Sequence, residues 1–219
     1  MIVKGWTSGS SWPQLVYAGR HNLPDGRIVV VTARIHGFNQ EFQLAKRFAT
    51  QLPHWLAWTS SLAELWNVLN RALPAEMNEG NFVSCSVASY VPGQRELECA
   101  MFGPAEPILV PCNETSSKLP AARFPYLGIL DDIDMTESYV AAPIRVQGGD
   151  TLVCHESVTH IWNSEQVEYG QERLERVVAR AASAGRDAAA IADAVVSDCG
   201  EHCGHDWSDW PAALMVAVF

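Results

Sequence analysis

The sequence predicts an α+β fold in four layers, with two antiparallel β-sheets stacked face to face and a pair of helices outside each sheet. Two observations carry this prediction. The hydrophobic period changes along the chain in the order strand, two helices, several strands, two helices, strand. The chain has 219 residues, 48% of them hydrophobic, which is enough for a core without disulfides or a structural metal. Residues 1–219 are therefore expected to form a single domain.

The first strand and helix pair are predicted from turn and capping signals. A β-branched run at residues 28–33 follows the turn signal Leu-Pro-Asp-Gly and indicates a fully buried strand. Apolar side chains of residues 42–48 then share one face of a helix. A second helix is expected to begin at Ser61, whose hydroxyl can cap it while Glu64 reaches back, and to stop at Pro74.

The middle of the chain has the period of strands. Turn signals rich in Gly and Pro separate the apolar runs, which favours an antiparallel hairpin or meander. The expected strands cover residues 82–90, 96–102, 108–110, 138–146 and 151–155.

The last third repeats the helix pair. Residues 174–181 carry an apolar stripe at helical spacing, and Gly185 is expected to end that helix. Asp187 can cap the next helix, which would bury Ile191 and Val195. The apolar run at residues 212–219 fits a closing strand.

Charge and hydropathy exclude several classes of protein. The chain has 15 Lys and Arg against 25 Asp and Glu, a formal net charge of −10, which argues against nucleic-acid binding because that affinity comes mostly from basic side chains. No apolar run approaches the roughly 18 residues of a membrane-spanning helix. The N-terminus lacks the apolar core of a signal peptide. We therefore expect a cytoplasmic protein whose six cysteines are reduced.

Motifs in the last third resemble, in their order, the metal-dependent Ser/Thr protein phosphatases of the PPM type (type 2C), and specifically their bacterial SpoIIE-like branch. The segment VQGGDTLV at residues 146–153 is similar to that family's Pro-Gly-Asp strand entry. ESVTH at residues 156–160 stands where the family has Asp-Gly-Val-Thr-Glu, and YGQERL at residues 169–174 where it has Phe-Gly-Glu-Glu-Arg-Leu.

Shorter matches extend this resemblance toward the N-terminus. Residues 127–129 are similar to the family's Pro-Leu-Gly-Val. Gly103 and Pro107 match its Ala-Gly-His-Asn-Pro-Pro turn. The segment LPDGR is similar to the segment before the family's first buried strand. The resemblance covers about residues 23–219 and leaves residues 1–22 divergent or truncated relative to the family. It implies the same PPM-like αββα sandwich that the periodicity predicts.

The resemblance also implies two Mg²⁺ or Mn²⁺ ions held between the sheets by aspartates, because hard divalent cations prefer several anionic oxygens. This chain departs from that ligand set. Residues 1–24, where the first family aspartate belongs, contain no Asp or Glu. The second position is occupied by Arg34, or by Thr32 if the match is shifted. The third is Glu156, and Asp209 matches the fourth.

We expect Arg34 to occupy the vacated metal position and to pair with Glu156 or Asp209, so that a fixed cation screens the remaining acids. The alternative is that Arg34 ends a strand and points into solvent. Glu156 and Asp209 stay candidate metal ligands, and the degenerate positions predict no bound cofactor or weak binding of Mn²⁺ or Mg²⁺.

Other side chains could carry chemistry. Cys199, His202, Cys203 and His205 are possible zinc ligands, although Gly200 and Gly204 suggest that they lie in a loop between helix and strand. His36 and His155 are candidate general bases, with the alternative that they are polar residues at strand ends.

These observations favour a pseudophosphatase, a regulatory protein-binding module in bacterial partner-switching signalling. The expected partner is a protein, such as a phosphoserine protein of that kind of module. An active phosphatase acting on phosphoserine through an atypical metal site, with Asp209, Glu156 and His36 or His155, is the alternative. A purely structural interaction domain is a third.

Overall fold

Two β-sheets form the centre of the protein. The structure is a computed structural model that describes residues 1–7, 16–37, 41–73, 80–112, 119–130, 141–204 and 210–219. Sheet A has the order β1-β10-β9-β6, and its strands are β1 (Ile2–Thr7), β10 (Ala213–Val218), β9 (Thr151–Glu156) and β6 (Ile108–Val110). Sheet B has the order β2-β3-β4-β5-β7 with β8 paired to β5, and its strands are β2 (Val16–Asn22), β3 (Ile28–His36), β4 (Phe82–Val91), β5 (Glu96–Phe102), β7 (Ala122–Phe124) and β8 (Ile144–Arg145).

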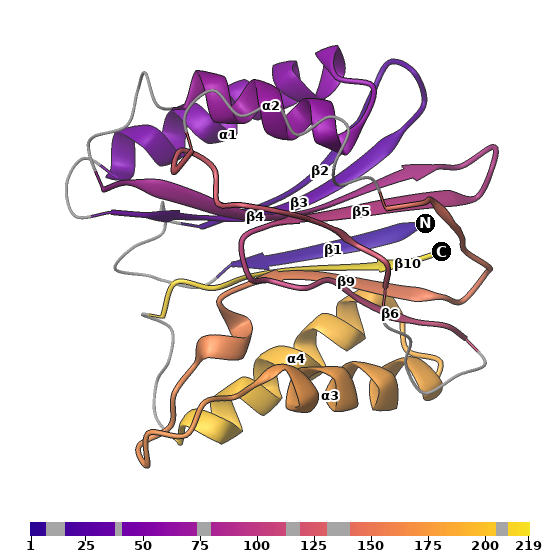
Figure 1. Ribbon diagram of the computed structural model, residues 1–219. Helices are drawn as coiled ribbons and strands as arrows, with labels where there is room; N and C mark the ends of the chain where they lie inside the picture. The colour runs from indigo at the N-terminus through magenta and orange to yellow at the C-terminus, as the bar shows by residue number, and fades with distance from the viewer. Residues whose placement is uncertain (8–15, 38–40, 74–79, 113–118, 131–140, 205–209) are drawn as a thin grey trace.

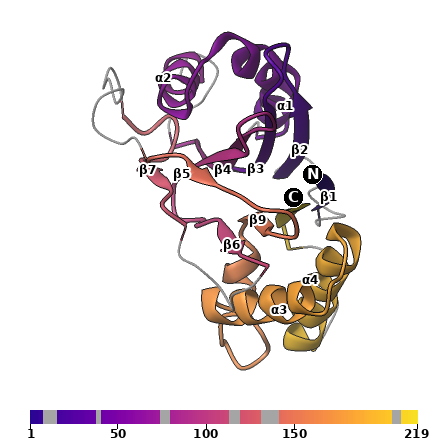
Figure 2. The same ribbon diagram turned by 90° about the vertical axis from the view of Figure 1, so that its right-hand side faces the viewer.

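A helix pair covers the outer face of each sheet, so the predicted four-layer sandwich is confirmed (Figures 1 and 2). Helices α1 (Glu41–Trp58) and α2 (Leu62–Ala72) pack on sheet B. Helices α3 (Gln171–Ser183) and α4 (Ala188–Cys203) pack on sheet A, and the short 3-10 helix η2 (Val158–His160) follows β9.

Alternation along the strands decides which side chains meet between the sheets. On β3, Val29 and Val31 pack under α1 and α2, whereas Val30 joins the core between the sheets. On β9, Val153 faces the α3–α4 layer, whereas Cys154 joins the core between the sheets. The polar positions that follow the same alternation on β3 and β9 therefore face one another across the sandwich.

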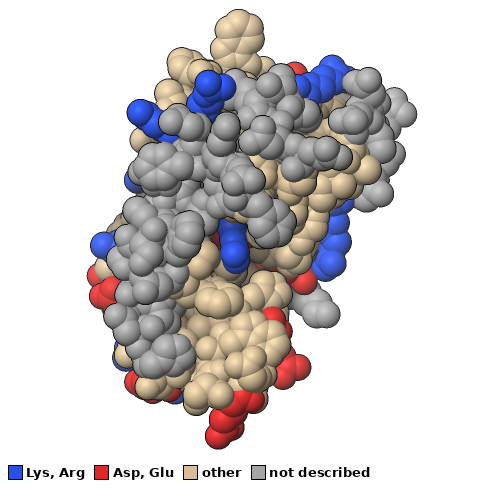
Figure 3. All heavy atoms as spheres, turned by 90° about the vertical axis from the view of Figure 1, so that its left-hand side faces the viewer, with Lys and Arg blue, Asp and Glu red and all other residues tan. Residues whose placement is uncertain are grey.

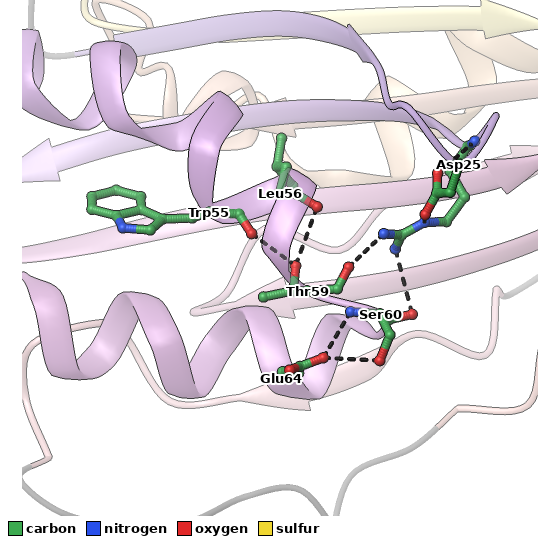
Figure 4. A network of polar contacts seen from close by, with 7 residues as sticks. Asp25, Trp55, Leu56, Thr59, Ser60 and Glu64 are labelled. Carbon is green, nitrogen blue, oxygen red and sulfur yellow. Dashed lines mark hydrogen bonds and ion pairs between the residues drawn. The ribbon is translucent and has the colours of Figure 1, made fainter.

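An arginine connects the β2–β3 turn to the α1–α2 connection. The Nε atom of Arg27 donates to Asp25 Oδ2 at 2.6 Å, and its Nη atoms donate to the carbonyl oxygens of Thr59 and Ser60. Figure 4 shows these carbonyls turned toward the turn that carries Asp25, with Glu64 accepting from Ser60. The network fixes the first helix pair against the end of sheet B.

The predicted cap of α2 is present with one difference. Ser61 Oγ accepts from the Glu64 backbone N–H at 3.1 Å, as expected. Glu64 reaches back one residue further than in a standard capping box, to the Ser60 backbone N–H at 2.7 Å.

The N-terminal segment and two sheet details differ from the expectation. No strand is predicted ahead of residue 28, yet β1 pairs with β10 and β2 pairs with β3. The pairing of β5 with β7 is parallel, so sheet B is not wholly antiparallel. Of the strand expected at residues 138–146, the short β8 is described, and residues 131–140 lie outside the described part.

Helix α4 continues through Gly200 to Cys203, so the loop expected there is wrong. Cys199 and Cys203 are buried in the core between α4 and sheet A, and this packing offsets the cost of about 1 kcal/mol for a glycine inside a helix. The helix ends at Gly204, whose φ of 65° is the left-handed conformation that glycine adopts without strain.

Candidate active site

Polar side chains gather between the sheets where β3, β4 and β9 lie together. Arg34 and His36 come from the end of β3, and Ser84 lies on β4 directly opposite Arg34. Glu156 is the last residue of β9, and Ser157 follows it in the left-handed conformation with a φ of 60°. The turn at Ser157 redirects the chain into η2 and brings its hydroxyl back toward sheet B.

Two hydrogen bonds connect the two sheets at this position, and a third joins His36 to Ser84 within sheet B. Arg34 Nη1 donates to Ser157 Oγ at 2.7 Å. Ser84 Oγ donates to Glu156 Oε2 at 2.7 Å and therefore accepts from His36 Nε2, which lies 2.8 Å away. Ser84 is thus the bridge between the imidazole and the carboxyl group.

Burial dominates the electrostatics of this cluster. Glu156 is 2% exposed, and its desolvation raises the pKa to about 8, although the Ser84 hydrogen bond and the Arg34 charge act in the opposite direction. Burial, together with the charge of Arg34, lowers the pKa of His36 to about 4. Near neutral pH, Arg34 is therefore the charged group of the cluster, and His36 and most of the Glu156 population are neutral.

The structure brings together three of the side chains singled out in the sequence: Arg34, His36 and Glu156. Arg34 is half-buried between the sheets, so the alternative in which it ends a strand and points into solvent is wrong. Among the described residues, Arg34 donates a hydrogen bond to Ser157, the neighbour of Glu156, while its charge acts on Glu156 itself. Thr32, the other degenerate position, is fully buried two residues earlier on β3.

His155 does not join this cluster. Asp209 lies outside the described residues. His155 points to the other face of sheet A, with Val153, toward the α3–α4 layer. It is 1% exposed, and burial lowers its pKa to about 4.

The possible zinc ligands are dispersed. Cys199 and Cys203 are buried core residues, and His205 is outside the described part. His202 lies at the surface of α4, with Nδ1 3.0 Å from Arg173 Nη1 and Nε2 3.1 Å from the Val167 carbonyl oxygen. Over the described ranges, no three His, Cys, Asp or Glu side chains converge on a possible metal position.

The described residues do not fit the two-metal centre that the resemblance implies. Of the carboxylates in the described part of the chain, only Glu156 reaches this cluster. On β2, in the segment where the family's first aspartate belongs, the residue opposite Arg34 is the buried Val16. A guanidinium about 5 Å from a divalent ion would cost about 7 kcal/mol of repulsion at an effective dielectric constant near 20.

Two residues of the cluster, Ser84 and Ser157, are not predicted from the sequence as site residues. A signal for Ser84 exists in β4, because Ser84 and Ser86 are polar positions on one face of an otherwise apolar, buried strand. Such positions need a polar partner when they are buried. For Ser157 the signal is the turn conformation, which the sequence does not display.

Two stacked sheets with a helix pair outside each form the fold of the PP2C-type protein phosphatase domains. The family model of Stage II sporulation protein E (SpoIIE) matches residues 43–219, and the chain belongs to this family.

Solved structures of the same fold agree with this assignment. The SiaA-PP2C domain of Pseudomonas aeruginosa is 13% identical, with a TM-score of 0.76 over 99% of this chain and 85% of that one. The RsbU and RsbW domains from Mycobacterium tuberculosis are 13% identical with a TM-score of 0.79, over 99% of this chain and 59% of that one. A structure of SpoIIE from Bacillus subtilis contains the PP2C phosphatase domain and a fragment of the regulatory domain. It is 12% identical with a TM-score of 0.72, over 99% of this chain and 62% of that one.

The chain thus spans about three fifths of the last two solved chains. No curated protein matches the sequence. None of the helices in the described ranges is long and apolar enough to cross a membrane.

Proposed function

We propose that this protein is a pseudophosphatase, a regulatory module of bacterial signalling that binds a phosphoserine-bearing partner protein without hydrolysing the phosphoester. The observation that carries the proposal is Arg34. Its guanidinium lies where the resemblance places a metal-binding aspartate, beside Val16 and within electrostatic reach of Glu156. A fixed cation there replaces part of the positive charge that two metal ions would supply, but it cannot activate a water molecule.

Arg34 has the chemistry and the access to bind a phosphate group. A guanidinium binds phosphate oxygens with parallel N–H donors, and the hydrogen bond to Ser157 restricts its orientation. Its side chain is half-buried rather than enclosed. On the face shown in Figure 3, basic side-chain atoms are visible near the middle.

The names of the structural neighbours support a protein partner. They include RsbU together with RsbW, and a bacterial stressosome described as a modular system. By analogy of fold, the partner of this chain would be a signalling protein whose phosphoserine binds at Arg34.

Metal and phosphopeptide titrations test the proposal. Calorimetry with Mn²⁺ is expected to show no binding, and a phosphatase assay on a phosphoserine peptide is expected to show no turnover. The same peptide should bind, and Arg34→Ala should weaken binding about 10- to 100-fold, the loss of one charged hydrogen-bonding group. Arg71→Ala, which removes an exposed arginine at the end of α2, is the matched control and should leave binding unchanged.

The competing function is an active phosphatase with an atypical metal site. Its support is Glu156, whose Oε1 atom is buried and has no hydrogen-bond partner among the described residues. Mn²⁺-dependent turnover that is abolished by Asp209→Ala and by Glu156→Gln would establish this function and refute the pseudophosphatase.

A further inference from the structure

A β-hairpin projects from the fold directly after the candidate site. It covers residues 161–169, beginning after η2 and ending at the start of α3. Tyr169 N–H donates to the Ile161 carbonyl oxygen at 2.7 Å, and Trp162 pairs with Glu168 in an antiparallel bridge. In Figure 1 this hairpin is the orange loop at the lower left, so it belongs to the lower part of the face in Figure 3.

The hairpin is preformed rather than dependent on a ligand for its shape. Asn163 Oδ1 accepts from the backbone N–H groups of Glu165 and Val167 at 3.0 and 2.9 Å. The carbonyl oxygen of Val167 lies 3.1 Å from His202 Nε2, which ties the hairpin to α4. A surface that is already ordered binds a partner with less loss of conformational entropy.

The exposed side chains of the hairpin combine apolar and acidic character. Trp162 is 42% exposed and Val167 is 52% exposed, and they are two of the five large hydrophobic side chains exposed in the described part of the chain. Glu165 and Glu168 are exposed beside them, and residues 161–169 contain no Lys or Arg. In Figure 3, acidic side chains gather along the lower edge of this face, below an uncharged area. Exposed Trp is enriched at the centres of protein interfaces.

The distance from Arg34 to this surface matches a short segment of polypeptide. Arg34 contacts Ser157, and Trp162 is five residues further along the chain. Because a chain advances at most about 3.4 Å per residue, Trp162 lies within about 17 Å of that contact. An extended partner segment covers this distance in at most about five residues.

We propose that the hairpin at residues 161–169 is a second docking point for the phosphoserine-bearing segment of the partner protein. It recognises an apolar side chain with a neighbouring Lys or Arg, within about five residues of the phosphoserine. The apolar side chain packs on Trp162, and the basic group faces Glu165, since the carboxylate of Glu168 is paired with His160 at 2.8 Å. This inference rests on the proposed function, because the phosphate group at Arg34 sets the register of the segment.

Two synthetic phosphoserine peptides test the hairpin, with calorimetry as the readout. The first carries Leu-Lys four residues from the phosphoserine on both sides, and the second carries Gly-Glu at the same places. The first should bind at least tenfold more tightly. Trp162→Ala and Glu165→Lys should each weaken the binding of the first peptide at least fivefold. Neither change removes a backbone hydrogen bond of the hairpin, and circular dichroism checks that the variants fold.

Matched controls separate docking from general effects. Trp58→Ala removes a Trp that is 85% exposed at the end of α1, on the other sheet. Asp193→Lys makes the same charge change on the exposed side of α4, and it measures the attraction of a basic peptide to an acidic chain. Both controls should change affinity less than twofold.

The possible outcomes distinguish the two proposals. If the first peptide binds and the hairpin variants bind it as tightly as the unchanged protein, the docking point is refuted while phosphoserine recognition at Arg34 stands. Equal affinity for the two peptides also refutes it. If neither peptide binds, and Arg34→Ala changes nothing, the proposed function fails and the docking point fails with it.

Discussion

Replacing Glu156 by Gln should make the protein more stable at neutral and alkaline pH. The carboxyl group is buried, has Ser84 as its hydrogen-bond partner and has a pKa raised to about 8. Gln is neutral at every pH and of almost the same size, and its amide oxygen can accept the bond from Ser84. The substitution therefore removes the cost of ionising a buried acid without leaving a cavity.

The size of this effect follows from the pKa values of the two states. A carboxyl group ionises at about 4.5 in the unfolded chain and at about 8 in the folded protein. The folded state therefore holds its proton more tightly, and the stability that Glu156 contributes at low pH is lost as the pH rises through this window. The loss is about 3 kcal/mol by pH 7 and about 4 kcal/mol between pH 5 and pH 9.

Two histidines with lowered pKa values act in the opposite direction. His36 and His155 have pKa values lowered to about 4, so they destabilise the folded state as the pH falls below about 6.5. They are present in both proteins, and their contribution cancels in the difference between the wild type and Glu156→Gln.

Urea unfolding at several pH values measures the difference. The free energies of unfolding of the two proteins should be similar at pH 5 and diverge in favour of the variant as the pH rises. A difference that is independent of pH would show that Glu156 ionises normally in the folded protein, and the burial argument would then be wrong.

Three other predictions concern the metal position and the packing. The double variant Val16→Asp, Arg34→Asp adds two adjacent carboxylates beside Glu156 and should gain Mn²⁺ binding in calorimetry. If the variant still binds no Mn²⁺, more than these ligands is missing. Leu174→Ala, at a fully buried position of α3, should lower the free energy of unfolding in urea by about 2–5 kcal/mol, and a loss under 1 kcal/mol would contradict the packing. Ser61→Ala should cost about 1 kcal/mol by removing the α2 cap in the same assay, whereas Ser61→Asp should retain most of the stability.

Elements with strong local signals are predictable from the sequence. The β-branched run of β3 and the Ser61 cap of α2 are both found in the structure. The strand β1 has no such signal, because it is an edge strand with most of its side chains exposed or half-buried, so no alternation appears. Gly200 indicates a loop by its local propensity, but the burial of Cys199 and Cys203 extends α4 past it.

The candidate site is predictable only in part. The meeting of Arg34 and Glu156 follows from the resemblance, which aligns both with metal ligands between the sheets. The bridging role of Ser84 requires the register of β3 with β4 and the stacking of the two sheets, which are long-range properties. His155 shows the limit of inference from neighbours in sequence, because successive residues of a strand face opposite sides of the sheet.

The pairing of β1 with β10 bears on how the chain folds during synthesis. Ile2 lies opposite Val218, so the two strands come from opposite ends of the sequence. Strands β2 to β5, with α1 and α2 between them, are complete once the first half of the chain has left the ribosome. At that stage β1 has been made, but its partner strand β10 has not yet been translated. Sheet A is therefore complete only when β10 has been made, because β10 lies between β1 and β9.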